Sequence, residues 1–175
     1  AWIWPWAIED NAGIFGRWVS NQAGWVLRTR FSTSRPGLRF EVQHSTTSVS
    51  ATIDQGSAYA VNQWTHVAAT WDGTLTASSA INFYVNGVLN TTNRTNSNGV
   101  GTQKDDSTRG LQIGATNLIE PTTGKFKGRL GPLKTWNRVL SAAEIAEDFL
   151  SPELVVPPRD RRRRYFNLVG DAGAP

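Results

Sequence analysis

Apolar and polar residues alternate in short stretches along the first hundred positions of the chain. The clearest stretches lie at residues 25–31, 38–42, 49–53 and 81–85. A period of two places the apolar side chains of each stretch on one face, which is typical of a half-buried antiparallel strand. The pattern therefore predicts a fold built from several short antiparallel strands.

A different pattern marks residues 64–71, where apolar side chains fall on both faces of an extended chain. One face carries Val67, Ala69 and Trp71, and the other carries Trp64 and Ala68 beside a histidine. A strand that is apolar on both sides needs cover on both sides. This stretch is therefore predicted to be a central or covered strand.

Two connections follow from local chemistry. Asn86-Gly87 supplies the two positive-φ residues of a type I′ turn, which predicts a tight hairpin between the flanking apolar runs. Residues 95–109 are polar, contain glycine and show no periodicity, so they are predicted to form a long loop. Loops at the rim of a sandwich are common binding sites.

One helix is expected near the end of the patterned region. Ser141 and Glu144 have the spacing of a capping box, and Leu140, Ile145 and Phe149 form an apolar stripe predicted to dock on the sandwich edge. Pro152 follows and is expected to end the helix. The proline-rich stretch 151–158 is then predicted to be an extended linker.

These elements predict an all-β fold: an antiparallel two-sheet jelly-roll sandwich with one short C-terminal helix and an extended basic tail. With 175 residues, of which 39% are hydrophobic, the chain is large enough for one sizeable core. We expect the sandwich over residues 1–150 and a linker with an Arg-rich docking tail over residues 151–175.

Charge is concentrated in that tail. Residues 159–164 hold five Arg and one Asp, which leaves 18 − 5 = 13 basic and 14 − 1 = 13 acidic residues elsewhere. Because the body is neutral, no nucleic-acid partner is predicted for the domain as a whole. The absence of Cys removes disulfides and thiolate chemistry, and no apolar run approaches the roughly 20 residues that span a bilayer, so no membrane partner is predicted.

The sequence predicts no enzyme. The glycosidase arrangement of two or three carboxylates alternating along one strand is missing, and the adjacent pairs Glu9-Asp10, Asp105-Asp106 and Glu147-Asp148 are expected to be solvated charges. No nucleophile elbow and no phosphate-binding glycine loop is present. A structural role is predicted for His66 within its strand, and a turn position for His44.

Tryptophan is the most prominent candidate for ligand contact. Trp2, Trp4 and Trp6 lie at a spacing of two, so they emerge on one face of an extended segment and are predicted to bind a sugar or a protein. The alternative is that a loop or another strand covers Trp2 and Trp4, and that Pro5 interrupts the pairing. The remaining five are expected in the core or at its rim, namely Trp18, Trp25, Trp64, Trp71 and Trp136.

Five segments occur in an order that resembles the laminin G-like, or concanavalin A-like, jelly-roll module: AWIWP, WTHVAATWDGT, INFYVNG, LQIGA and FKGRLGPLKTWNRVLSAAEI. The resemblance covers roughly residues 1–150 and implies the same sandwich. Modules of this kind bind sugars, proteins or neighbouring subunits, and some are attached to enzymes. Related modules often hold Ca²⁺ at a rim, for which Asp72, Asp105 and Asp106 are the candidates, although Gly131, which Pro132 follows, stands where the family commonly has an acidic residue.

Members of this family usually reach a strand like AWIWP after one or two earlier strands. We therefore expect that the numbered chain lacks its first strands. The alternatives are removal of an initiator Met before Ala1 in a shortened fold, and an edge strand supplied by another protomer.

The basic segment combines Arg161, Arg162, Arg163 and Arg164 with Tyr165 and Phe166. Arginine clusters with aromatic anchors suit docking on a partner. A laminin G-like module that ends in such a segment resembles bacteriophage virion proteins.

The expectation is a non-catalytic surface binding or assembly module, a capsid decoration or fibre component. Its expected location is the virion surface or the extracellular space, with neighbouring virion subunits as partners and a cell-surface glycan as a further one. The alternative is a carbohydrate-binding module of a secreted bacterial protein.

Overall fold

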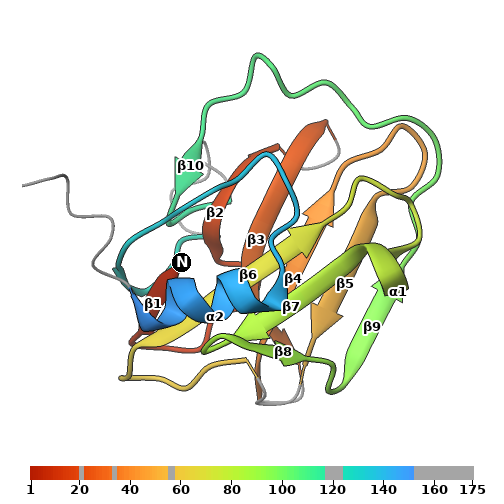
Figure 1. Cartoon of the computed structure of the whole chain (residues 1–175). Coiled ribbons are helices and arrows are strands. Elements are labelled where there is room, and N and C mark those ends of the chain that lie inside the picture. Colours follow the sequence, from red (N-terminus) through yellow and green to blue (C-terminus); the bar gives the residue numbers. More distant parts are fainter. Residues whose placement is uncertain (20–21, 33–34, 55–57, 117–123, 152–175) are drawn as a thin grey trace, which may run out of the picture.

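The chain forms two antiparallel sheets that pack face to face (Figure 1). The computed structural model describes residues 1–19, 22–32, 35–54, 58–116 and 124–151. Within these residues one sheet has the order β11-β1-β6-β7-β8, with β1 at Trp2–Pro5, β6 at Thr65–Trp71, β7 at Ile81–Val85, β8 at Val88–Asn90 and β11 at Gly128–Leu130. The other has the order β10-β2-β3-β4-β5-β9, with β2 at Gly13–Val19, β3 at Ala23–Ser32, β4 at Arg35–Val42, β5 at Val49–Ile53, β9 at Arg94–Ser97 and β10 at Gln112–Ile113.

The hydrophobic core lies between the two sheets. Ile3, Val67 and Phe83 point into it from the first sheet, and Leu38 and Ile53 enter from the second; all five are fully buried. This arrangement confirms the all-β sandwich. Burial of such side chains contributes about 1.5 to 3 kcal/mol each, which offsets the entropy lost on folding without any covalent crosslink.

Most of the strands predicted from the period-two pattern are confirmed. The stretches at 25–31, 38–42, 49–53 and 81–85 fall within β3, β4, β5 and β7, and β6 lies between β1 and β7 as the predicted covered strand. The hairpin between β7 and β8 is also confirmed, because Asn86 and Gly87 have φ values of 48° and 79°. The Asn86 side chain additionally accepts a hydrogen bond from the His66 backbone N–H at 2.9 Å.

One prediction is corrected, and one element was not expected. Residues 95–109 are not all loop, because Thr95 to Ser97 belong to β9, which pairs with β5. β9 is an edge strand with mostly exposed side chains, so its sequence carries no apolar period. The one-turn helix α1 at Ala77–Ala80 was also not indicated by the sequence pattern.

The predicted helix is α2, at Ala142–Leu150, and its capping box between Ser141 and Glu144 is present. Its position differs from the expectation: α2 lies across the outer face of the five-stranded sheet, not at a sandwich edge (Figure 1). Ile145 packs there with Leu140 and Tyr84. Phe149 stacks on Trp2 with ring centroids 5.5 Å apart.

The docking tail lies outside the described residues, as does Pro152. Neither helix in the described part of the chain has the length and apolar character needed to cross a membrane.

Of the five tryptophans expected in the core or at its rim, Trp18 is buried and Trp25 and Trp71 pack against the core. Trp64 and Trp136 are 42% and 45% exposed, so they are surface residues instead.

The capping box makes a testable contribution to stability. Ser141→Ala removes the side-chain oxygen that accepts the Glu144 N–H, so we expect the free energy of unfolding to fall by about 1 kcal/mol. Ser141→Asp keeps an acceptor at the same position and should retain most of the stability. Urea denaturation of both variants measures the difference, and equal losses in the two would contradict a capping role.

Candidate binding site

A cleft of about 620 Å³ opens between the two sheets beside the start of β1. Its floor consists of side chains from β2, β3 and β4: Phe15, Trp25, Leu27 and Phe40. Its walls are residues 68–73 at the end of β6 and residues 134–140, which lead into α2. The cleft is therefore lined by aromatic side chains, of which Trp25 is half-buried and Phe15 and Phe40 are 8% and 9% exposed.

The aromatic rings on the floor contact one another. The centroids of Phe15 and Trp25 lie 5.4 Å apart in an edge arrangement, and Phe40 lies 6.4 Å from Trp25. Trp71 lines the wall, where its ring meets His44 edge-on at 6.2 Å. A concave, aromatic surface of this size is typical of a binding site.

Polar groups surround the mouth of the cleft. Arg17 donates from Nε to the Arg109 carbonyl at 2.9 Å, and its guanidinium lies 3.9 Å from an Asp106 oxygen. Asp72 and Gln103 also line the mouth. The cleft thus combines an apolar floor with a few polar groups that can orient an occupant.

The predicted tryptophan row is divided by the fold. Trp2 is covered by α2 and stacks on Phe149, whereas Trp4 meets Trp64 edge-on at 5.7 Å. Trp6 lies beyond the end of β1 and is 56% exposed. The structure therefore does not bring Trp2, Trp4 and Trp6 onto one open face, and Trp64 joins Trp4 and Trp6 as an accessible aromatic residue.

The three calcium candidates are engaged in their own loops. An Asp72 oxygen accepts hydrogen bonds from the Thr74 N–H at 2.9 Å and from its hydroxyl, and these bonds lower the pKa of Asp72. Asp105 caps Ser107 in the same way, and Asp106 faces Arg17. Among the described residues no group of three or more His, Asp or Glu is placed to hold a metal ion. The contacts of these three residues do not test the calcium expectation, which stays a prediction.

A buried polar cluster fixes α2 to the sheet. His66 Nε2 lies 3.2 Å from an Asp148 carboxylate oxygen, and Lys134 pairs with the other oxygen of that carboxylate. His66 is 1% exposed and, within the described structure, its Nδ1 has no hydrogen-bond partner. Its structural role within the strand is consistent with the prediction. The expectation that Asp148 is a solvated charge is wrong, because it bridges the His66 imidazole and the Lys134 ammonium group under the helix.

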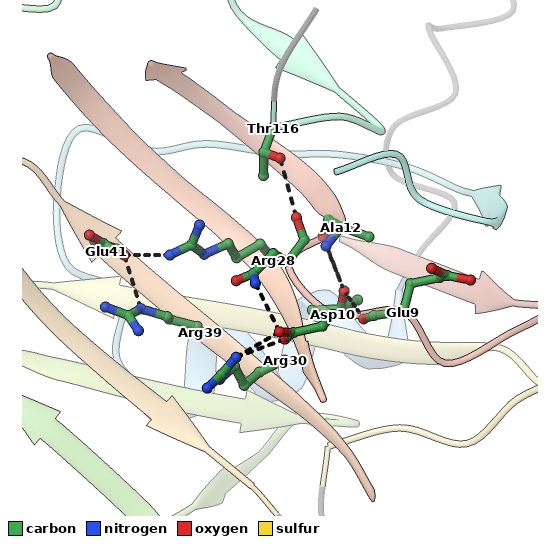
Figure 2. A network of polar contacts seen from close by, with 10 residues as sticks. Glu9, Asp10, Ala12, Arg28, Arg30, Arg39, Glu41 and Thr116 are labelled. Carbon is green, nitrogen blue, oxygen red and sulfur yellow. Dashed lines mark hydrogen bonds and ion pairs between the residues drawn. The ribbon is translucent and has the colours of Figure 1, made fainter. Parts of the chain in front are cut away.

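A second polar network lies on the outer face of the six-stranded sheet (Figure 2). Glu41 pairs with Arg28 at 2.6 Å and with Arg39 at 2.9 Å, while Arg30 pairs with Asp10 at 2.8 Å. Glu9 similarly pairs with Lys127 at 2.7 Å, so the Glu9-Asp10 charges are not simply solvated. Each arginine in the network already has a carboxylate partner, which leaves little capacity for a separate anion.

The residues of the cleft were only partly accessible to sequence reasoning. Phe15 and Phe40 read as ordinary core positions, and Arg17 carries no motif. No local signal marks these residues, because the cleft forms from segments that are far apart in the sequence. His44 lies in the connection between β4 and β5, consistent with the prediction of a turn.

The sequence profile of the concanavalin A-like lectin/glucanases superfamily matches residues 1–146. The chain belongs to this superfamily. Pappalysin-1 of Mus musculus is similar to it, with 26% identity over 171 residues, or 90% of this chain. The chain spans about 10% of the length of that relative, so the likeness concerns one part of the mouse protein.

His66 makes stability depend on pH. Burial lowers its pKa from 6.5 to about 4, and the nearby Ala1 amino group acts in the same direction against Asp148. The unfolded chain therefore takes up this proton first as the pH falls. We expect stability to be complete above pH 6.5 and to decrease by about 3 kcal/mol between pH 6.5 and pH 4.

Denaturant titrations at several pH values measure this loss. His66→Gln removes the titrating group and should flatten the profile in that window. His44→Gln is the matched control because His44 is the other histidine of the chain. A slope that persists in His66→Gln but disappears in His44→Gln would show that the wrong histidine has been assigned.

The network of Figure 2 gives a further prediction. Glu41→Met leaves the half-buried Arg28 and Arg39 without their carboxylate, so unfolding should become about 2 to 3 kcal/mol easier. Glu9→Met is the comparison, because it removes a carboxylate from an exposed pair with Lys127 and should change stability by about 0.5 kcal/mol. Thermal unfolding would contradict the ranking if both variants lost the same amount.

Proposed function

We propose that this chain is a non-catalytic binding and assembly module that holds a partner through the cleft at the end of its sandwich. The observation that carries the proposal is the cleft itself, a concave space lined by the half-buried Trp25 and Trp71, with Arg17 and Asp72 beside them. Aromatic side chains beside a few polar groups are typical of a pocket that binds a partner.

The state of the carboxylates supports a non-catalytic role. A glycosidase needs two carboxyl groups across a substrate, either about 5 to 5.5 Å or about 6.5 to 9.5 Å apart. Here the two most sheltered examples, Glu41 and Asp148, are each held by two cationic or imidazole partners. Their geometry suits structural pairing better than proton transfer.

In the finer form of the proposal, the module belongs to a bacteriophage particle as a capsid decoration or fibre component. The support is the sequence of the tail, where Arg161 to Arg164 precede Tyr165 and Phe166. Their charge and aromatic surface suit docking on neighbouring virion subunits. The sandwich would then be displayed outward at the virion surface.

A second candidate function is glycan binding by a secreted bacterial protein. It is favoured by the exposed aromatic residues Trp6 and Trp64, with Trp4 packed against Trp64. Aromatic faces stack on sugar rings. An oligosaccharide that changes tryptophan fluorescence in the natural chain but not in Trp64→Ala would support this function.

The assembly proposal is tested by the native mass of the chain, measured by light scattering in low and high salt, with and without residues 158–175. We expect multimers in low salt that dissociate in high salt and are absent from the truncated chain, because the tail arginines make the contacts. A monomer that is indifferent to salt in both forms would overturn assembly and favour the glycan-binding function.

A further inference from the structure

Side chains form cross-strand rows on the outer face of the five-stranded sheet, where β11, β1 and β6 lie side by side. The register places Ile3 opposite Thr65 of β6 and Trp4 opposite Arg129 of β11. Ile3 and Thr65 are buried, so Trp4 and Trp64 beside them point to the outer face. Arg129 lies on the same face as Trp4, because directly opposite residues of an antiparallel pair share one side of the sheet.

α2 covers only part of this outer face (Figure 1). Phe149 stacks on Trp2, the outward residue near the start of β1. Trp4 follows two residues later along the strand, about 7 Å away, and is only half-buried. Trp6 comes after the buried Pro5 and is 56% exposed. The outer face is therefore covered at Trp2 and open at Trp4 and Trp6.

Trp64 widens the open region. Its ring meets Trp4 edge-on at 5.7 Å, and its side chain stays 42% exposed. The ring also reaches across β1 toward β11, because a Cβ atom at Gly131 would lie 3.4 Å from its Cζ3 atom. The glycine leaves room for the ring at this position. We call the surface formed by Trp4, Trp6, Trp64 and Arg129 the tryptophan platform.

The tryptophan platform contains a cation that has no carboxylate partner in the described part of the chain. Arg129 is exposed, and no described Asp or Glu pairs with it. Lys127, two residues earlier on the same side of β1, differs because it pairs with Glu9 at 2.7 Å. The Arg129 guanidinium group is therefore available for an anionic group that lies on the tryptophan rings.

We propose that the tryptophan platform binds an acidic oligosaccharide, whose sugar rings lie on Trp4 and Trp64 and whose carboxylate pairs with Arg129. The inference rests on the glycan-binding function given above and names its class of ligand. The apolar C–H face of a pyranose ring packs on an aromatic ring. A planar guanidinium group matches a planar carboxylate through two parallel hydrogen bonds.

The shape of the tryptophan platform favours a sugar chain over a single sugar. The platform continues along the chain from Trp4 to Trp6, so a ligand that covers both positions needs more than one ring. Phe149 blocks the surface at Trp2, which leaves the direction toward Trp6 open.

The charge of the tryptophan platform favours an acidic sugar over a neutral one. A neutral sugar contacts the aromatic rings alone and leaves Arg129 to water, whereas a uronic acid adds an ion pair. Because Arg129 is exposed, we expect this pair to improve the affinity by about five- to tenfold.

Matched tetrasaccharides test the inference by tryptophan fluorescence titration of the full chain in low salt. Each pair shares its linkages and differs only in oxidation of the primary alcohols to carboxylates: cellotetraose with tetraglucuronate, mannotetraose with tetramannuronate, and galactotetraose with tetragalacturonate. We expect a Kd about five- to tenfold lower for the acidic member of at least one pair. The difference should shrink in high salt, because exposed charges are screened.

Three variants locate the effect. Arg129→Gln removes the available cation and should abolish the preference for the acidic member, without a change in the unfolding temperature because the side chain is exposed. Arg30→Gln is the matched control and should keep the preference, because it removes the same charge from the outer face of the other sheet. Trp64→Ala should weaken the binding of both members.

The inference and the glycan-binding function fail in different ways. If both members of every pair bind equally, or if the preference persists in Arg129→Gln, glycan binding stands and selection by Arg129 is rejected. A preference that survives in Trp64→Ala with unchanged affinity would reject the tryptophan platform as the site. If no tetrasaccharide changes the fluorescence, both the inference and glycan binding are rejected. A peptide of four glutamates that binds as tightly as the acidic sugars would reject the sugar and identify an acidic peptide as the ligand.

Discussion

The pairing of β6 is the constraint on which the rest of this structure depends. β6 joins β1 to β7, sends Val67 into the core and holds His66 beneath α2. Every backbone group of such a covered strand needs a partner, since an unpaired buried amide costs about as much as a lost hydrogen bond. Val67 meets this requirement by exchanging two backbone hydrogen bonds with Ala1, and His66 meets it through Asn86.

Short-range chemistry explains what could be predicted from the sequence. Apolar and polar residues alternate in β3, β4, β5 and β7 because one face of each strand is buried. The hairpin after β7 follows from the backbone conformations of Asn86 and Gly87 alone. β9 escaped prediction because an exposed polar edge strand has no apolar period. The cleft escaped it because it depends on how residues 134–140 pack beside the two sheets, which is a matter of long-range packing. The same limit applies to the tryptophan row, since nothing local indicates that α2 covers Trp2.

In the body of the domain, the sheltered carboxylates pair with side chains on neighbouring elements. Glu41 satisfies two arginines across neighbouring strands, and Asp148 satisfies His66 and Lys134 between sheet and helix. Such sheltered pairs fix the positions of the strands and of the helix that they join, because removal of one member leaves a sheltered charge without a partner. The surplus of positive charge lies in residues 159–164, where five arginines accompany one aspartate. The charge available to a partner is thus separated along the chain from the charge that holds the fold.

The position of α2 also links strands that are not neighbours in the sheet. Phe149 stacks on Trp2 of β1, and Ile145 packs on Tyr84 of β7. The helix therefore crosses β6 and cannot leave one of these strands without releasing the other. Detachment of α2 would expose the buried His66 ring to water, so the helix determines how much of this sheet face solvent can reach.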